Sequence, residues 1–355
     1  MVKIKKNFWK NKKVLITGHT GFKGSWLTNY LLFKSAKVYG LSLKPKTKKN
    51  LYDTLKIKNS IKEKFINILD QKKIKKYYDL INPDITFHLA AQSLVIDSIK
   101  DPKLTFSTNI MGTFNILDCF NHNKKSKVCI IVTSDKCYEN NNNSKKFNEN
   151  SKLGGDDPYS SSKACAELIV NSYRKTFIKN KINKNVSTVR AGNVIGGGDW
   201  GDYRLIPDLI DAIYEDKEIV IRDKKSTRPW QHVLDCIHGY TSLAEKMYNY
   251  NNKFDGAWNF GPLYSKKINV KNLIEDTAKH FKLKDIRNIK YGKNIHNEKR
   301  SLYLDSRKSF NKLKWKPKLN YIKSLIITLD WYKAFYEKKD MVEFTNKQIE
   351  DYLKI

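Results

Sequence analysis

A tyrosine and a lysine stand four residues apart at the start of a predicted helix. Tyr159 and Lys163 follow Asp157 and Pro158, a pair that favours a helix N-cap and first turn. Residues four apart share one face of a helix, so the phenol and the ammonium group can converge. A nearby cation stabilises a phenolate and lowers the tyrosine pKa. The pair predicts a general base for a sugar or alcohol hydroxyl, and a core tyrosine beside a surface lysine is the alternative.

Three glycines form a second candidate site. Gly18, Gly21 and Gly24 lie in the stretch TGHTGFKG, between an apolar run at 13–17 and a helix predicted for 25–34. In such a turn the first glycine permits a tight bend, the second lets a pyrophosphate approach the backbone, and the third lets helix and sheet pack closely. The helix N-terminus offers free N–H groups to the phosphates. The pattern predicts a dinucleotide site, and an unliganded glycine turn is the alternative.

The residues that would determine the preference for NAD or NADP differ from the usual pattern of a dinucleotide site. A site of this kind commonly has an acidic residue after the second strand, where it binds the ribose hydroxyls. Here Ser42, Leu43, Lys44 and Pro45 occupy that position. Lys44 could face a 2′-phosphate and favour NADP, or it could be an ordinary surface lysine. We expect NAD and leave NADP open.

An aspartate and a lysine stand side by side after another predicted strand. Asp135 and Lys136 follow the run 127–133, at the edge where open α/β sheets bind their ligands. By themselves the two residues favour a structural ion pair in a loop, because such pairs greatly outnumber catalytic ones. Only the surrounding motifs favour catalysis.

Apolar runs and helical stripes alternate along the first 190 residues. This alternation is typical of a parallel, doubly wound sheet. We therefore expect an α/β fold, with a Rossmann-like doubly wound parallel sheet and a smaller mixed α/β C-terminal substrate domain. Strands are predicted at 13–17, 37–43, 65–69, 85–89, 127–133 and 186–190, and helices at 25–34, 71–81, from 101 towards 120, from 158 onward and at 321–337. The last helix is predicted to present one stripe of Ile322, Leu325, Leu329, Tyr332 and Tyr336.

The composition of the 355-residue chain narrows its possible partners. Lys and Arg outnumber Asp and Glu by 68 to 36, which gives a net charge of +32, but the lysines are spread along the chain. We interpret them as a solvated basic surface and expect no nucleic-acid partner, with a dedicated nucleic-acid site as the alternative. The sequence has no apolar window of about 18 residues, so we expect no membrane-spanning helix. Five cysteines without a CxxC pair, and no secretory leader, favour a reduced cytoplasmic protein.

Several motifs together carry a family resemblance. Four motifs together resemble those of the extended short-chain dehydrogenases/reductases. They are TGHTGFKG, HLAAQ at 88–92, TSDKCY at 133–138 and YSSSK at 159–163. Four later motifs resemble, more specifically, the CDP-glucose 4,6-dehydratase branch of that family. They are RAGNVIGGGDW at 190–200, RLIPD at 204–208, TRPWQHV at 227–233 and WNFGP at 258–262. The resemblance spans nearly the whole chain, from Phe8 to the last predicted helix.

The resemblance implies a lyase that removes water from a nucleotide-linked glucose without net oxidation. Tyr159, assisted by Lys163, would take the proton of the C4 hydroxyl while the nicotinamide carries the hydride. Asp135 matches the acid that protonates the leaving C6 hydroxyl, and Lys136 matches the base at C5, where many relatives have glutamate. Asp135 must hold a proton and Lys136 must be neutral, which burial favours in both cases. Ser134 matches a hydroxyl that hydrogen-bonds the sugar.

The same matching assigns binding residues and no metal site. Guanidinium groups suit a diphosphate, which favours the two arginines among the substrate residues. Cofactor contacts are implied for Gly18, Thr20, Gly21, Phe22, Gly24, Lys44, Asn67, Ile68, Ala90, Ala91, Asn109, Tyr159 and Lys163. Substrate contacts are implied for Gln92, Asn193, Gly198, Arg204, Arg228 and Trp230.

The resemblance also implies an organisation. Residues 1–190, completed by about 232–262, would form the dinucleotide-binding domain, and 191–231 with 263–355 the nucleotide-sugar-binding domain. Two long helices, 105–122 and 160–179, imply a homodimer or a dimer of dimers. The product, CDP-4-dehydro-6-deoxy-D-glucose, would feed deoxysugar synthesis for a surface polysaccharide such as lipopolysaccharide O-antigen.

Three alternatives remain at this point. Another nucleotide-sugar dehydratase and a 4-epimerase share the superfamily, but an epimerase needs no acid at C6, which the Asp135–Lys136 pair would supply. A non-catalytic dinucleotide-sensing or nucleic-acid-binding protein is an alternative of a different class, and the Tyr159–Lys163 pair argues against it.

Overall fold

The computed structural model describes residues 8–140, 146–221, 223–251, 253–262, 268–292 and 302–355. Seven strands form one sheet, in the order β11-β7-β5-β4-β1-β2-β3, and every neighbouring pair is parallel. The chain thus winds outward from β1 in both directions, which confirms the predicted doubly wound sheet. The strands are β1 (Lys13–Thr17), β2 (Lys37–Ser42), β3 (Lys62–Phe65), β4 (Ile85–His88), β5 (Val128–Val132), β7 (Asn185–Ala191) and β11 (Gly256–Phe260).

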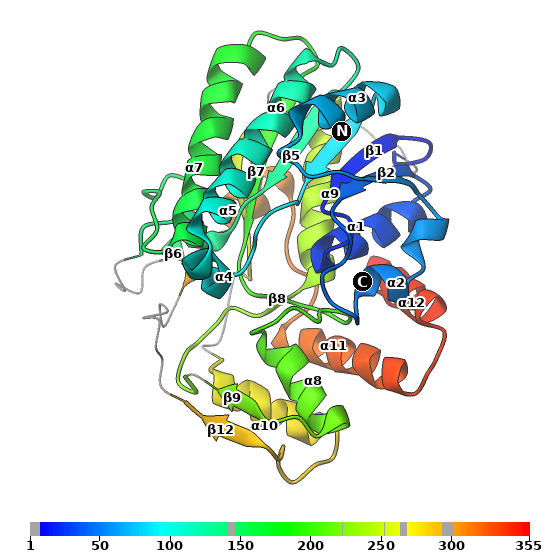
Figure 1. Cartoon of the computed structure of the whole chain (residues 1–355), viewed down its shortest axis with the longest axis vertical. Coiled ribbons are helices and arrows are strands. Elements are labelled where there is room, and N and C mark those ends of the chain that lie inside the picture. The colour runs from blue at the N-terminus through cyan, green and yellow to red at the C-terminus, as the bar shows by residue number, and fades with distance from the viewer. Residues whose placement is uncertain (1–7, 141–145, 222, 252, 263–267, 293–301) are drawn as a thin grey trace.

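Helices cover both faces of the sheet (Figure 1). On one face α1 (Phe22–Phe33) and α9 (Val233–Asn249) pack on alternate strand residues such as Val14 and Ile130. On the other face α3 (Gln71–Ile81), α6 (Gly112–His122) and α7 (Pro158–Tyr173) pack on Leu15 and Ile131. Successive residues of a strand point to opposite faces, so short, wholly apolar strands supply both cores.

Two long helical runs lie side by side on the second face. One comprises α5 (Pro102–Phe106), the π-helical turn η2 (Ser107–Met111) and α6, and the other comprises α7 and the π-helical turn η4 (Arg174–Ile178). The side chains of Asp101 and Asp157 accept N-cap hydrogen bonds from Leu104 N and Ser160 N, and a proline follows each aspartate. Cap and proline make each helix begin where the sequence predicts.

Smaller elements form a lobe below the carboxyl edge of the sheet (Figure 1). Its two-stranded parallel pairs are β8 (Val194–Ile195) with β10 (Gln231–His232) and β9 (Ile219–Ile221) with β12 (Ile289–Tyr291). Its helices are α8 (Leu205–Glu215), α10 (Val270–His280) and α11 (Tyr321–Tyr336). This mixed α/β lobe agrees with the predicted fold class, while the domain boundaries stay a prediction.

The remaining elements are short, apart from a C-terminal helix that packs beside α1. They are α2 (Leu51–Thr54), η1 (Ile57–Asn59), α4 (Val95–Lys100), η3 (Asp135–Cys137), β6 (Lys146–Phe147) paired with β13 (Tyr303–Leu304), η5 (Ser309–Leu313) and the helix α12 (Met341–Lys354).

Two sequence predictions about elements were wrong. The third strand was predicted at 65–69 but spans Lys62–Phe65, because its register pairs Lys62 with Tyr39 and Phe65 with Ser42, where β2 ends. It is an edge strand, and its charged residues suit that position. The stripe predicted for the last helix was wrong at Ile322, which is 49% exposed, and the sequence reading overlooked α12.

Within the described residues, no helix is long and apolar enough to cross a membrane. The same residues contain no group of three or more His, Cys, Asp or Glu side chains that could hold a metal ion.

Candidate active site

The glycine turn after β1 has one glycine that the protein itself does not require. A Cβ on Gly18, whose φ is +76°, would lie 2.7 Å from Ala90 N, and a Cβ on Gly24 would lie 2.0 Å from the Gly18 carbonyl oxygen. Gly21 is exposed, and its Cβ would meet only the Gly18 oxygen at 3.5 Å, an ordinary contact. Gly21 is also the N-cap of α1 without a side-chain cap. An exposed, uncapped backbone of this kind fits a pyrophosphate.

Hydrogen bonds tie the glycine turn to the end of β2. Thr20 donates to the Leu43 carbonyl oxygen at 2.9 Å and shares a 2.7 Å hydrogen bond with Ser42, which ties the turn to the end of β2. Lys44 is exposed beyond that end. Asn67 is exposed, and its side chain accepts from Leu69 N at 3.0 Å, while Ile68 beside it is buried.

A buried asparagine organises the loop after β4. Asn109 donates to the Gln92 carbonyl and to Ser162 Oγ, and it accepts from Gln92 N, all at 2.8–2.9 Å. The Gln92 amide donates to Leu94 O and Thr105 Oγ1 and accepts from Leu94 N. Gln92 therefore has an internal bonding role where the sequence predicts a substrate contact. Half-buried Ala90 and Ala91, and the half-buried Phe22 at the start of α1, lie at the same edge of the sheet.

Tyr159 and Lys163 lie in the first two turns of α7, and both are buried. Burial raises the pKa of Tyr159 to about 12, the Asp135 charge adds to this rise, and Ser134 and Arg204 act against it. The sequence prediction of a lowered tyrosine pKa is therefore wrong for the protein alone, because burial outweighs neighbouring cations.

Lys163 Nζ donates to the Val132 carbonyl oxygen at 3.2 Å, which holds the ammonium group against the end of β5. Burial and the charge of Lys23 lower the pKa of Lys163 to about 8, although Glu167 and Cys137 act in the opposite direction. Lys163 is thus cationic at neutral pH but close to losing its proton above it.

The predicted acid and base occupy the turn η3 directly after β5. Ser134 caps this turn: its hydroxyl accepts from Lys136 N at 3.2 Å and donates to Asp135 Oδ1 at 3.1 Å. Burial raises the pKa of Asp135, against the lowering charges of Lys136, Lys23 and Arg228. That direction suits an acid that must hold a proton, as the sequence reading expects.

Asp135 packs against the strand that follows α7 in the chain. A Cβ on Gly192 would lie 2.9 Å from Asp135 Oδ2. A side chain at position 192 would therefore require the Asp135 carboxyl group to move. Asp135 interacts electrostatically with both Lys136 and Tyr159. The predicted acid, base and phenol therefore lie near one another at the carboxyl edge of the sheet.

Lys23 is a site residue that the sequence reading missed. It lies in the first turn of α1, and burial lowers its pKa, with Arg204 adding to that effect and Asp135, Asp199 and Cys236 opposing it. Its charge acts in turn on Lys163 and on Asp135. The signal was present in the sequence, because Lys23 stands inside the glycine motif, on the helix end that faces the sheet edge.

Two of the predicted substrate residues join this cluster from the lower lobe. Arg204 is the N-cap residue of α8, donates to Asp199 Oδ2 at 2.6 Å and acts on the Tyr159 phenol. Arg228 donates to the Thr227 carbonyl at 3.0 Å and acts on Asp135. Trp230 is half-buried, and its indole Nε1 has no hydrogen-bond partner among the described residues.

The glycines at 197 and 198 are packed closely by the protein itself. A Cβ on Gly198 would lie 2.5 Å from Leu51, and one on Gly197 would lie 2.0 Å from Trp331. Protein packing therefore accounts for Gly198, where the sequence predicts a substrate contact. Asn193 is half-buried, and its carbonyl accepts from Gln231 N at 3.1 Å, which joins β8 to β10.

A parallel sheet with a glycine turn after its first strand and a buried Tyr–Lys pair at its carboxyl edge defines a short-chain dehydrogenase/reductase. Residues 15–326 match the family described as GDP-mannose 4,6 dehydratase. The CDP-glucose 4,6-dehydratase of Salmonella typhimurium is 37% identical over 354 residues, covering 99% of this chain and 98% of the relative. The chain belongs to this family of nucleotide-sugar 4,6-dehydratases.

Solved structures agree with the fold. The dTDP-glucose 4,6-dehydratase DesIV of Streptomyces venezuelae, determined with NAD bound, has a TM-score of 0.79 at 20% identity, with 93% of this chain and 99% of that chain covered. A UDP-glucose 4-epimerase of Thermotoga maritima also has a TM-score of 0.79 at 20% identity, covering 91% and 99%. Dehydratases and epimerases thus share this architecture.

Proposed function

We propose that the protein dehydrates CDP-glucose to CDP-4-dehydro-6-deoxyglucose with bound NAD. The observation that carries the proposal is the buried acid Asp135, with Lys136 beside it, coupled to the Tyr159 phenol at the carboxyl edge of the sheet. An epimerase needs no acid for a departing C6 hydroxyl. The 37% identity to a named CDP-glucose 4,6-dehydratase supports the choice of nucleotide.

NAD would lie over the glycine turn, with its pyrophosphate on the open backbone of Gly21 and its nicotinamide towards Tyr159 and Lys163. When bound, NAD would supply the acceptor for a hydride from C4 of the sugar and the donor for its return to C6. The exposed Lys44 leaves room for a 2′-phosphate as well, so the preference for NAD over NADP is part of the proposal.

The side chains would then move the protons. Tyr159 takes the proton of the C4 hydroxyl, and the Lys163 ammonium stabilises the phenolate that this requires. With a ketone at C4, the C5 proton becomes acidic, and Lys136 removes it. Asp135, whose pKa is raised by burial, gives its proton to the leaving C6 hydroxyl, which departs as water. Arg204 and Arg228 would hold the diphosphate.

A panel of nucleotide sugars tests the proposal. The enzyme with NAD is incubated with CDP-, dTDP- and UDP-glucose and with GDP-mannose, and the alkali-dependent absorbance of a 4-keto-6-deoxy sugar is followed. We expect kcat/KM to be highest for CDP-glucose. Equal or higher values for another nucleotide would overturn the cytidine assignment, and a 4-epimer as the only product would overturn dehydration itself.

We also infer a homodimer in the cytoplasm. The two helical runs that the sequence predicts as dimer helices carry large exposed apolar side chains, which favours a partner on that face. These side chains are Leu104, Phe106, Met111, Leu168 and Phe177. All five cysteines are unpaired, which suits a reducing compartment.

Leu168→Glu tests the dimer. Leu168 is 57% exposed on α7, and a carboxylate there would have to be buried between two subunits. We expect sedimentation to show a monomer for this variant. The matched control is Leu80→Glu on α3, which is 76% exposed and outside the two runs, and it should stay dimeric. A Leu168→Glu variant with the sedimentation behaviour of the wild type would contradict this interface.

A further inference from the structure

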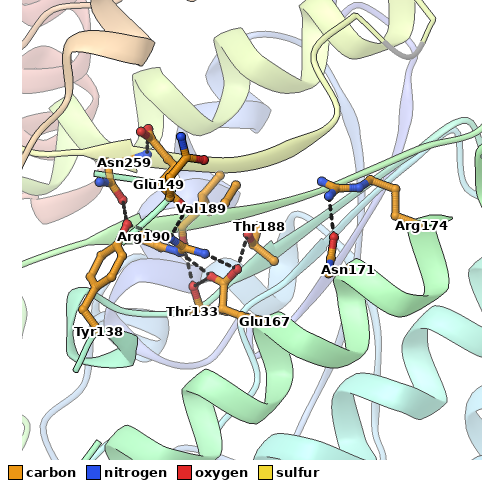
Figure 2. A network of polar contacts seen from close by, with 12 residues as sticks. Thr133, Tyr138, Glu149, Glu167, Asn171, Arg174, Thr188, Val189, Arg190 and Asn259 are labelled. Carbon is orange, nitrogen blue, oxygen red and sulfur yellow. Dashed lines mark hydrogen bonds and ion pairs between the residues drawn. The ribbon is translucent and has the colours of Figure 1, made fainter. Parts of the chain in front are cut away.

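A buried ion pair joins Glu167 of α7 to Arg190 of β7 (Figure 2). Arg190 Nη2 and Nε donate to Glu167 Oε2 and Oε1 at 2.7 and 2.8 Å, and both side chains are only 3% exposed. The Glu167 carboxylate also accepts from Thr133 Oγ1 at 2.5 Å and from Thr188 Oγ1 at 2.6 Å. Such a pair is costly to desolvate and is stable only when every donor and acceptor is satisfied, as here.

The carboxylate fixes the catalytic helix to the sheet. Glu167 lies one turn beyond Lys163 and two turns beyond Tyr159 on α7. Its partners Thr133 and Arg190 belong to the carboxyl ends of β5 and β7, two neighbouring strands. These bonds therefore fix the rotation of α7 and its distance from the sheet, close to the two catalytic residues that the helix carries.

The guanidinium group reaches the second catalytic segment. Arg190 Nη1 donates to Tyr138 Oη at 2.6 Å, and Tyr138 directly follows the turn η3 that carries Asp135 and Lys136. The Tyr138 hydroxyl donates in turn to Asn259 Oδ1 at 2.8 Å on β11. One ion pair thus holds both the Tyr–Lys helix and the acid–base turn (Figure 2).

We propose that Glu167 and Arg190 are positioning residues, which fix the distance between the Tyr159–Lys163 helix and the Asp135–Lys136 turn. This inference rests on the proposed dehydration. Both residues act through others, because Glu167 holds α7 and Arg190 holds Tyr138, the residue after η3.

The charges around Lys163 give the pair a measurable signature. Lys23 of α1 faces the ammonium group and lowers its pKa, whereas Glu167 of α7 and Cys137 of η3 raise it. His88 of β4 also lies within reach, but burial and the Lys163 charge lower the pKa of His88 to about 3, so it stays neutral. Removing the Glu167 charge therefore lowers the Lys163 pKa further below its present value of about 8.

Glu167→Gln is the first test, because it keeps the shape and removes the charge. We expect kcat to fall about tenfold to a hundredfold with little change in KM, since a small misplacement of catalytic groups slows chemistry. Lys163 must be cationic, so activity is lost as pH rises through its pKa. The alkaline limb of the pH profile should move to lower pH in Glu167→Gln. Glu167→Asp, which retains the charge, should keep the limb at its wild-type position.

The matched control is Glu149→Gln. Glu149 accepts from Asn259 N at 2.9 Å, and its carbonyl accepts from Arg190 at 3.5 Å, so it belongs to the same region without bonding to α7. We expect no displacement of its alkaline limb. If the limb stays in place in Glu167→Gln, or moves equally in Glu149→Gln, the proposal is overturned.

Two further measurements keep the test independent of folding and of the substrate. If Glu167→Gln unfolds because Arg190 is left unpaired, Glu167→Gln/Arg190→Met removes the buried charge and should fold with the same displaced limb. NMR of enzyme labelled at the lysine ε-carbon, with the Lys163 signal assigned by its loss in Lys163→Met, titrates Lys163 without any sugar. An unchanged Lys163 titration in Glu167→Gln would refute the inference, whereas inactivity of the wild type towards every nucleotide sugar would refute only the proposed function.

Discussion

The Tyr159 phenol is protonated in the protein alone, because burial raises its pKa to about 12. A base at neutral pH needs a much lower pKa. Arg204 already opposes the rise caused by burial, and the Lys163 ammonium lies one turn along the same helix. The tyrosine and its surroundings thus work as one unit.

Tyr159→Phe tests this unit. The substitution removes the phenolic proton acceptor and leaves the buried ring in place, so we expect kcat to fall by about 10²–10⁴-fold. Binding of NAD and of CDP-glucose, followed by calorimetry, should change little. Turnover close to that of the wild type would contradict the role of the phenol.

Lys23→Met tests the residue that the sequence reading missed. Lys23 lowers the pKa of Lys163, so its removal should raise that pKa above about 8 and move the alkaline limb of the pH profile to higher pH. Lys34→Met, at the opposite end of α1, is the control and should leave the limb in place. A limb that moves in neither variant would remove Lys23 from the site.

At the scale of elements, the glycine turn combines two separate demands. Gly18 and Gly24 are required by the protein's own packing, whereas at Gly21 an ordinary side chain would fit against the protein. The φ and ψ of Gly21, −78° and 165°, are open to any residue. Glycine at this position therefore indicates a bound group.

Gly21→Ala and Gly24→Ala separate these demands. The added methyl at Gly24 would lie 2.0 Å from the Gly18 oxygen, so we expect this variant to lose several degrees in Tm through overpacking. Gly21→Ala should keep the wild-type Tm and raise the Kd for NAD. Thermal unfolding and fluorescence titration measure the two effects, and unaltered NAD binding by Gly21→Ala would argue against a pyrophosphate at this turn.

The sequence predicted local elements well and tertiary contacts poorly, for physical reasons. The caps at Asp101 and Asp157 and the apolar strands are local signals, and they led to the correct helices and sheet. At Gly197, by contrast, the glycine makes room for Trp331, more than a hundred residues away in the chain. No local pattern indicates such a contact.

At the scale of the whole molecule, buried carboxyl groups fasten distant segments together. Asp235 of α9 accepts from Lys318 N and from Tyr352 Oη, both at 2.8 Å, which ties α12 to the core. Burial raises the pKa of Asp235 to about 6, from an ordinary value of 3.8. The folded state therefore prefers the protonated carboxyl group.

This preference predicts how stability depends on pH. Because the folded pKa is higher than the unfolded one, the stabilisation from Asp235 is complete below pH 3.8 and is lost as pH rises through about 6. The shift corresponds to about 3 kcal/mol. Asp235→Asn cannot ionise, so its Tm relative to the wild type should increase between pH 4 and pH 7. A constant difference across that range would show that Asp235 does not contribute this dependence.

The indole of Trp26 on α1 donates to the Gly197 carbonyl oxygen at 2.9 Å, and Trp331 of α11 fills the space over the same glycine. On α1, Asn29 also donates to Asn346 of α12 at 3.0 Å. Helix α1 thus completes its packing only when α11 and α12, which follow about three hundred residues later, have been translated. A nascent chain arrested before Trp331 would carry the glycine turn without this packing behind α1.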